Sequence, residues 1–273
     1  MLGKLLKHEF RATSRILPVL YGISALSVLL CFLFNRLHID LLTGTTGVIS
    51  VISIIAVMIL TIALIISRYY KSMYSNEGYL GGTLPVSSNL MIFSKALVAF
   101  VWVVLSVLIC ALLMIAFVSI FADPSEMLRA IGQLIGSYTL ARQAIVFFLV
   151  IGVLESLYFI AGVYFAITLS NTPPFQKLGI GGAVVIYIVY YTVASVASIF
   201  FMLLIPVCVV IAPEGMRLSF QPMFTSFTEM LRSESSTIVG VPLGLGSFFF
   251  EAVMCVALFW LTAFFGRKYA SVR

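Results

Sequence analysis

Charged residues are scarce in this 273-residue sequence. Only 10% of the positions are Asp, Glu, Lys or Arg, whereas 62% are hydrophobic. A soluble domain carries about 25% charged residues, which hydrate its surface. This scarcity excludes a soluble globular protein and predicts a chain that lies almost entirely in a lipid bilayer.

Several chemical motifs are also missing. The sequence has no G-x-x-x-x-G-K-[ST] phosphate loop, so we do not expect the chain to hydrolyse ATP on its own. It has no H-E-x-x-H motif, and its two histidines flank the first apolar stretch at opposite membrane edges, which argues against a metal site. No Ser/His/Asp set is available within one leaflet. We therefore expect a non-catalytic chain that binds no metal and no cofactor. The four cysteines lie in apolar stretches without metal spacing: Cys31, Cys110, Cys208 and Cys255.

Long apolar runs are the main feature that is present. A membrane-spanning helix needs about 20 mostly apolar residues. Six stretches qualify, at about 16–34, 47–66, 96–121, 144–169, 179–204 and 248–265. They predict an all-α polytopic membrane protein, with residues 1–273 forming one transmembrane domain and both termini on the same side.

The basic residues gather on one side of these spans. Eleven of the sixteen lie in the termini and in the loops at 68–95 and 170–178, and five lie on the other side. Cytoplasmic loops of membrane proteins are enriched in Lys and Arg, so both termini are predicted to be cytoplasmic. The same rule explains the net charge of +6 without a nucleic-acid partner.

Residues 1–15 precede the first span and are amphipathic. Lys4, Lys7, Arg11 and Arg15 recur at helical spacing, opposite an apolar side that includes Phe10. This pattern predicts a helix on the inner membrane surface. The helix either anchors the chain only or also docks a partner, and the sequence leaves both open.

The fifth apolar stretch continues beyond the length of one span. Pro206 is expected to end or kink that helix. Residues 207–247 then form an outer segment with a short surface helix at 224–231, either standing in water or re-entering the membrane edge.

Two polar features fall inside the predicted spans. Glu155 lies within the fourth span and needs a partner, because a carboxylate at the bilayer centre is costly. It is either a pathway or proton-relay residue or a protonated residue bonded between helices. On the fifth span, one helical face carries a polar stripe, which either lines a translocation pathway or links helices: Tyr187, Tyr191, Ser195 and Ser198.

The segment at 68–95 is the polar interruption on the predicted inner side. Glu77 precedes a stretch that could form a short helix over 78–84, and Pro85 ends it. Ser87 or Ser88 can then cap a helix that runs through Lys95 into the third span. This elbow predicts a docking surface for a soluble partner. The alternative is a structured turn with an interfacial aromatic belt.

A family resemblance rests on this segment. The pattern Ser75-Asn-Glu-Gly-Tyr-Leu-x-x-Thr-Leu-Pro-Val-Ser87, followed by Ser94-Lys95 at the start of an apolar span, resembles the permeases of type-2 ABC transporters, especially small bacterial ones. The basic N-terminus, the six spans and the long outer segment are similar to theirs. The sequence departs from them in Gly81-Gly82, where bulkier residues would stiffen the helix.

The resemblance implies an ATP-driven exporter of the bacterial cytoplasmic membrane. Two permeases, identical or paired with a sister subunit, would assemble with two cytosolic ATPase subunits that bind ATP and Mg²⁺. The segment would be the coupling helix, the N-terminal helix would pack beside it, and the second and fifth spans would line the pathway for a hydrophobic or amphipathic peptide, drug or lipid. The implied ATPase interface comprises Ser75, Asn76, Glu77, Gly78, Tyr79, Leu80, Leu84 and Pro85.

Glu155 supports a different hypothesis. An ion- or proton-coupled secondary transporter would use this intramembrane carboxylate instead of an ATPase. Such transporters commonly contain inverted repeats and broken helices, and neither is clear in this sequence.

Overall fold

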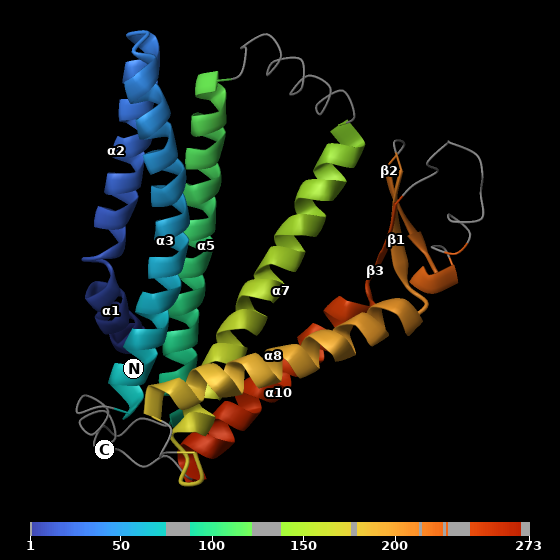
Figure 1. Cartoon of the computed structure of the whole chain (residues 1–273). Coiled ribbons are helices and arrows are strands. Elements are labelled where there is room, and N and C mark those ends of the chain that lie inside the picture. Colours follow the sequence, from blue (N-terminus) through green and yellow to red (C-terminus); the bar gives the residue numbers. More distant parts are fainter. Residues whose placement is uncertain are drawn as a thin grey trace. The chain divides into compact units, whose positions relative to one another are not determined.

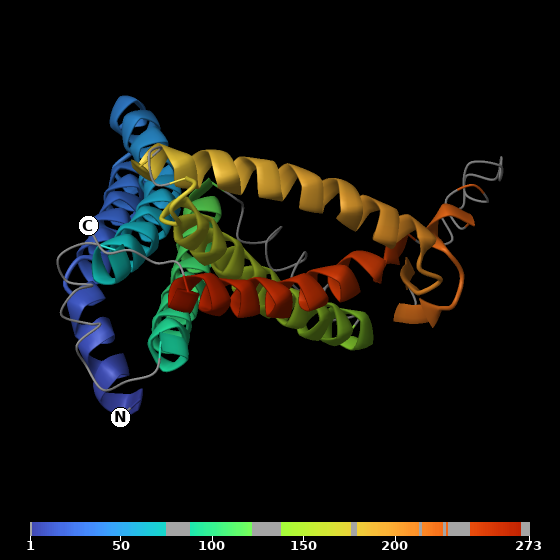
Figure 2. The ribbon, with the colours of Figure 1, turned by 90° about the horizontal axis from the view of Figure 1, so that it is seen from below.

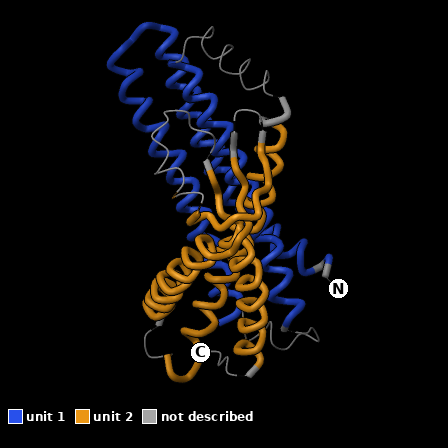
Figure 3. The backbone as a smooth tube through the Cα atoms, turned by 90° about the vertical axis from the view of Figure 1, so that its right-hand side faces the viewer, with its two compact units in different colours: residues 1–130, 271–273 blue, residues 131–270 orange. Residues whose placement is uncertain are grey.

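The computed structural model describes residues 2–74, 88–121, 138–175, 179–212, 215–225, 228 and 241–268. The chain divides into two compact units, residues 1–130 with 271–273 and residues 131–270 (Figure 3). Within the described residues, six helices are long and apolar enough to cross a membrane. The predicted all-α, multi-pass architecture is therefore confirmed.

Four helices form the first unit (Figure 1): α1 (Leu2–Thr13), α2 (Leu17–Arg36), α3 (Asp40–Tyr74) and α5 (Ser88–Phe121). Helix α1 is the predicted N-terminal amphipathic helix. Helices α2, α3 and α5 run side by side and form the apolar bundle. The three are in mutual contact, and α1 packs on α5.

A polar group lies inside this bundle and links its three long helices. Ser106 of α5 is fully buried, and its Oγ lies 2.6 Å from the Tyr21 hydroxyl of α2 and 3.0 Å from Thr61 Oγ1 of α3. Buried hydroxyl groups between apolar helices stabilise their association because they have no water to bond to. Trp102 and Leu17 belong to the apolar core around this group.

Helix α3 is longer than the span predicted at 47–66. It covers 35 residues and continues through Arg68 to Tyr74. Tyr69 and Tyr74 are 1% and 3% exposed. Packing of these side chains therefore stabilises the end of the helix that extends beyond its most apolar part. Helix α5 starts at Ser88, so Ser88 is its first helical residue, and the other predicted capping position, Ser87, lies outside the described residues. Both ends of the 68–95 segment are therefore helical, while residues 75–87 lie outside the described residues.

The connection between α2 and α3 contains an unusual backbone conformation. His38 has a φ of 54°, in the left-handed region that favours glycine. Its amide N–H donates to the Asn35 carbonyl, and the N–H of Ile39 donates to the Phe34 carbonyl, both at 3.2 Å. This pair of bonds ends α2 in a Schellman motif with histidine at the usual glycine position.

The second unit contains three long helices: α7 (Tyr138–Ser170), α8 (Gly179–Leu204) and α10 (Gly246–Lys268). All three contact one another around a core that includes Ala161, Cys255 and Leu258. Helix α8 ends two residues before Pro206, in agreement with the expected effect of this proline. The start of α10 packs against the end of α8, where a Cβ on Gly246 would lie only 2.0 Å from the Phe201 carbonyl oxygen.

A small antiparallel sheet follows α8, and the sequence did not predict it. Its strands are β1 (Cys208–Ala212), β2 (Gly215–Ser219) and β3 (Val241–Gly244), in the order β2-β1-β3. Short apolar runs such as β1 do not distinguish strand from helix by periodicity. Of the predicted surface helix at 224–231, residues 224, 225 and 228 are helical and the rest lies outside the described residues.

Candidate functional site

The predicted inner end of the first unit contains a buried ionic cluster. The carboxylate of Glu9 on α1 accepts a hydrogen bond from the Lys95 ammonium of α5 and another, at 3.2 Å, from Arg68 Nε of α3. Glu9 and Lys95 are each 8% exposed. We call these three residues the Glu9 cluster. One carboxylate thus joins three helices of the unit.

Helix α1 lies beside α5 (Figure 2), and two further side-chain contacts fix it there. Trp102 Nε1 of α5 donates a hydrogen bond of 2.7 Å to Thr13 Oγ1, and the Trp102 ring stacks on Phe10 with a centroid distance of 4.8 Å. Glu9 and Thr13 are four residues apart and therefore lie on one face of α1. That face is bound to protein, so α1 is more than a membrane-surface anchor.

The Glu9 cluster lies close to both ends of the segment that the sequence singled out. Arg68 is about two helical turns before the end of α3 at Tyr74, and Lys95 is about two turns after the start of α5 at Ser88. A displacement of residues 75–87 would therefore act on two helices held by the same carboxylate. The predicted ATPase-interface residues all lie outside the described residues: Ser75, Asn76, Glu77, Gly78, Tyr79, Leu80, Leu84 and Pro85.

Sequence reasoning missed the role of Glu9. The charge pattern of residues 1–15 was interpreted from their basic residues alone. The available signal was its place in α1, whose other charged residues are all basic. An acid in such a helix is a reasonable partner for cations on the neighbouring spans.

The predicted polar stripe of α8 divides into two parts in the structure. The rings of Tyr187 and Tyr191 stack at 6.0 Å, and Tyr191 is 55% exposed. Further along, Ser195 is half-buried, and Ser198 Oγ donates a hydrogen bond of 3.2 Å to Glu251 Oε1 of α10. The stripe therefore contributes the exposed ring of Tyr191 and a bond between helices. The bond agrees with the helix-linking interpretation, while the pathway interpretation stays a prediction.

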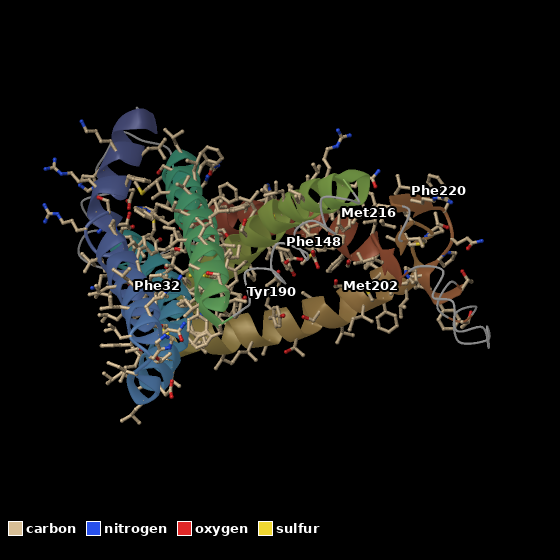
Figure 4. The ribbon with its side chains drawn as sticks, turned by 90° about the horizontal axis from the view of Figure 1, so that it is seen from above. Phe32, Phe148, Tyr190, Met202, Met216 and Phe220 are labelled. Carbon is tan, nitrogen blue, oxygen red and sulfur yellow. The ribbon has the colours of Figure 1, made fainter. Side chains whose placement is uncertain are left out.

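Tyr190 of α8, which is not one of the four stripe residues, packs closely against α7 at Gly162. Figure 4 shows Tyr190 on α8. A Cβ on Gly162 of α7 would come within 2.9 Å of its ring. Its ring also lies 6.3 Å from that of Tyr158 and 6.2 Å from that of Phe165. Gly162 thus creates the space in which this aromatic group packs.

Glu155 has a carboxyl neighbour inside the second unit. Its side chain lies near that of Glu251 on α10. Glu251 Oε2 is buried and has no hydrogen-bond partner among the described residues. Two carboxylates close together repel each other when both carry a charge. The sequence indicated only that Glu155 needs a partner. The structure places Glu251 of α10 beside it.

These features define the class of the protein as an all-α, multi-pass membrane protein with an ionic cluster in its first unit and a carboxyl pair in its second. In the part of the chain that the structure describes, no group of three or more His, Cys, Asp or Glu could hold a metal ion. Comparison of the chain with protein-family models, curated proteins and solved structures gives no match. Its function is therefore argued from its own residues.

Proposed function

We propose that the chain is the membrane-spanning permease subunit of an ATP-driven exporter and that it is coupled to separate cytosolic ATPase subunits through residues 75–87. The observation that carries this proposal is the Glu9 cluster. The helices that enter and leave residues 75–87 are bound to each other and to α1 through one buried carboxylate.

This connection suggests a transmission mechanism. Closure of an ATPase dimer would push on residues 75–87. The Glu9 cluster would make α1, α3 and α5 respond together, because separating any of them would leave a buried charge without its partner. The motion would change access to a pathway that includes the half-buried Tyr187 and the exposed Tyr191, and a hydrophobic or amphipathic peptide, drug or lipid would be exported along it.

The test is purification of the full chain from its native membrane, followed by measurement of MgATP hydrolysis and identification of the accompanying subunits. We expect an ATPase, and a second permease if the transporter is a heterodimer. The double variant Glu77→Ala/Tyr79→Ala should insert normally and lose the hydrolysis that co-purifies with the wild-type chain.

The double variant Asp40→Ala/Thr45→Ala is the matched control, because it changes the opposite end of α3. It should retain the co-purifying hydrolysis. Unchanged hydrolysis in the Glu77→Ala/Tyr79→Ala variant would refute docking at residues 75–87. The absence of any ATPase from the wild-type preparation would refute the proposed function.

The Glu155–Glu251 contact favours a second candidate function, an ion- or proton-coupled secondary transporter. Neighbouring carboxyl groups within membrane spans are a feature of proton relays. Ser198 donates to Glu251 as well, so helices α7, α8 and α10 all contribute to this group.

The two functions differ in a reconstituted system. The chain alone in liposomes, with an imposed pH gradient and a pH-sensitive dye inside, should show no proton flux above that of empty liposomes if the exporter proposal is correct. Flux that persists without an ATPase and is abolished by Glu155→Gln would favour the secondary transporter.

A further inference from the structure

An open groove runs between α1 and the first turns of α5. Its volume is about 570 Å³, within the range typical of ligand sites. Phe10 of α1 and Leu97 and Val101 of α5 supply much of its apolar wall, and these three side chains are 41%, 37% and 38% exposed. Apolar side chains thus remain accessible beside a contact that is otherwise tightly packed.

Two cations border this groove. Lys7 and Arg11 line it and are one helical turn apart on α1, so both can approach one ligand. Neither forms an ion pair with another described residue. Glu9 does not neutralise them, because its carboxylate is bonded to Lys95 and Arg68. The groove therefore combines an apolar wall with two positive charges that no acid among the described residues compensates.

We propose that this groove binds one anionic phospholipid, with an acyl chain along the apolar wall and the phosphate between Lys7 and Arg11. An amphipathic helix with basic residues attracts anionic lipids to the membrane interface, where α1 is expected to lie. Charge complementarity selects an anionic headgroup. The length of the apolar wall selects a lipid over free phosphate, which would leave Phe10, Leu97 and Val101 exposed to water.

This site is independent of the proposed transport function. It requires only that the first unit be embedded in a membrane. Arg68 and Lys95 remain with Glu9, so lipid binding does not need the Glu9 cluster to open.

The fluorescence of Trp102 can report lipid binding at this groove. Its ring stacks on Phe10, which lines the groove. The chain has only one other tryptophan, Trp260, which is 65% exposed and would respond to any lipid. The experiment uses the full chain with Trp260→Phe in detergent micelles. Dibrominated phosphatidylglycerol or dibrominated phosphatidylcholine is added at equal mole fractions, and quenching of Trp102 fluorescence is recorded.

We expect half-maximal quenching at a mole fraction of phosphatidylglycerol that is roughly tenfold lower than for phosphatidylcholine, because two basic residues contact the headgroup. The variant Lys7→Gln/Arg11→Gln should reduce this preference to about twofold or less. The matched control Arg15→Gln/Lys71→Gln removes the same charge from exposed positions outside the groove and should keep the preference. Val101→Phe, which fills the groove without a charge change, should weaken quenching by both lipids.

Three results would overturn the proposal. Equal quenching by the two lipids in the wild-type chain would show that no headgroup is selected. Loss of the preference for phosphatidylglycerol in the Arg15→Gln/Lys71→Gln control would show that the overall positive charge of the surface, and not the groove, attracts the lipid. No quenching by either lipid would show that the groove is filled by protein. The wild-type comparison remains decisive if the Lys7→Gln/Arg11→Gln variant does not fold.

Discussion

Glu9 connects three helices of the first unit through its buried carboxylate. Its carboxylate is taken out of water and is shared by two cations, from positions 59 and 86 residues further along the chain. Removing one member of a buried ion pair costs about 3–5 kcal/mol, because the remaining charge stays buried without compensation. The pairing could not be predicted from the sequence, since it depends on how three helix ends approach one another in space.

The first prediction concerns Glu9→Gln. This substitution keeps the shape of the side chain and removes its charge, which leaves the Lys95 ammonium without its counter-charge. We expect a loss of about 3 kcal/mol in the free energy of unfolding, the lower end of the range because the amide still accepts hydrogen bonds. Unfolding can be followed in detergent with a maleimide dye that reacts with the four buried cysteines as they become accessible.

Two further variants test whether the unpaired Lys95 charge causes this loss of stability. Adding Lys95→Met to Glu9→Gln removes the stranded charge and should recover part of the stability, which a double-mutant cycle would show as a coupling between the two positions. Arg15→Gln, at an exposed position of the α1–α2 connection, should change stability by no more than about 0.5 kcal/mol. Additive effects of Glu9→Gln and Lys95→Met would contradict the buried ion pair.

At the scale of elements, hydropathy located every long helix but only some of the helix ends. The predicted span at 179–204 coincides with α8, whereas the prediction at 47–66 falls well inside α3. Hydropathy detects only the apolar part of a helix, which is the part expected to lie in the bilayer. Polar ends such as Arg68 to Tyr74 remain helical because they pack on neighbouring helices. The sheet of β1, β2 and β3 escaped prediction because runs this short do not distinguish a strand from a helix. In addition, the pairing of β1 with β3 links segments that are distant in sequence.

The second prediction is that His38→Gly stabilises the first unit. His38 is exposed and has a left-handed backbone, which costs a non-glycine residue roughly 1–2 kcal/mol. Glycine avoids this cost but gains entropy in the unfolded chain, so a net gain of about 0.5–1 kcal/mol is expected in the same unfolding assay. His38→Ala should give no gain. Equal stability of the glycine and alanine variants would contradict the proposed strain.

At the scale of the whole molecule, the multi-pass architecture follows from composition alone, because a chain with this little charge cannot hydrate its surface. The orientation rests on the distribution of Lys and Arg. The polar contacts within the units, including the Glu155–Glu251 pair, required coordinates. Hydropathy gives the positions of Glu155 and Glu251 along their helices but not the rotation that makes them face each other.

The third prediction concerns orientation in the membrane. Thr45 is exposed near the start of α3, and Tyr79 follows the end of the same helix in sequence, so cysteines at the two positions should lie on opposite sides. In intact cells, a membrane-impermeant maleimide should label the Thr45→Cys variant, and it should label the Tyr79→Cys variant only after the cells are permeabilised. The native cysteines are buried and should give little background. The reverse pattern would contradict cytoplasmic termini.

The most direct test of the central claim is cross-linking from position 79 in the native membrane. A cysteine-reactive photo-cross-linker on the Tyr79→Cys variant should capture a nucleotide-binding protein that hydrolyses MgATP, and the same reagent on the Thr45→Cys variant should not. This result would support docking of an ATPase on residues 75–87. Capture of no ATPase from position 79, or of the same protein from both positions, would contradict it.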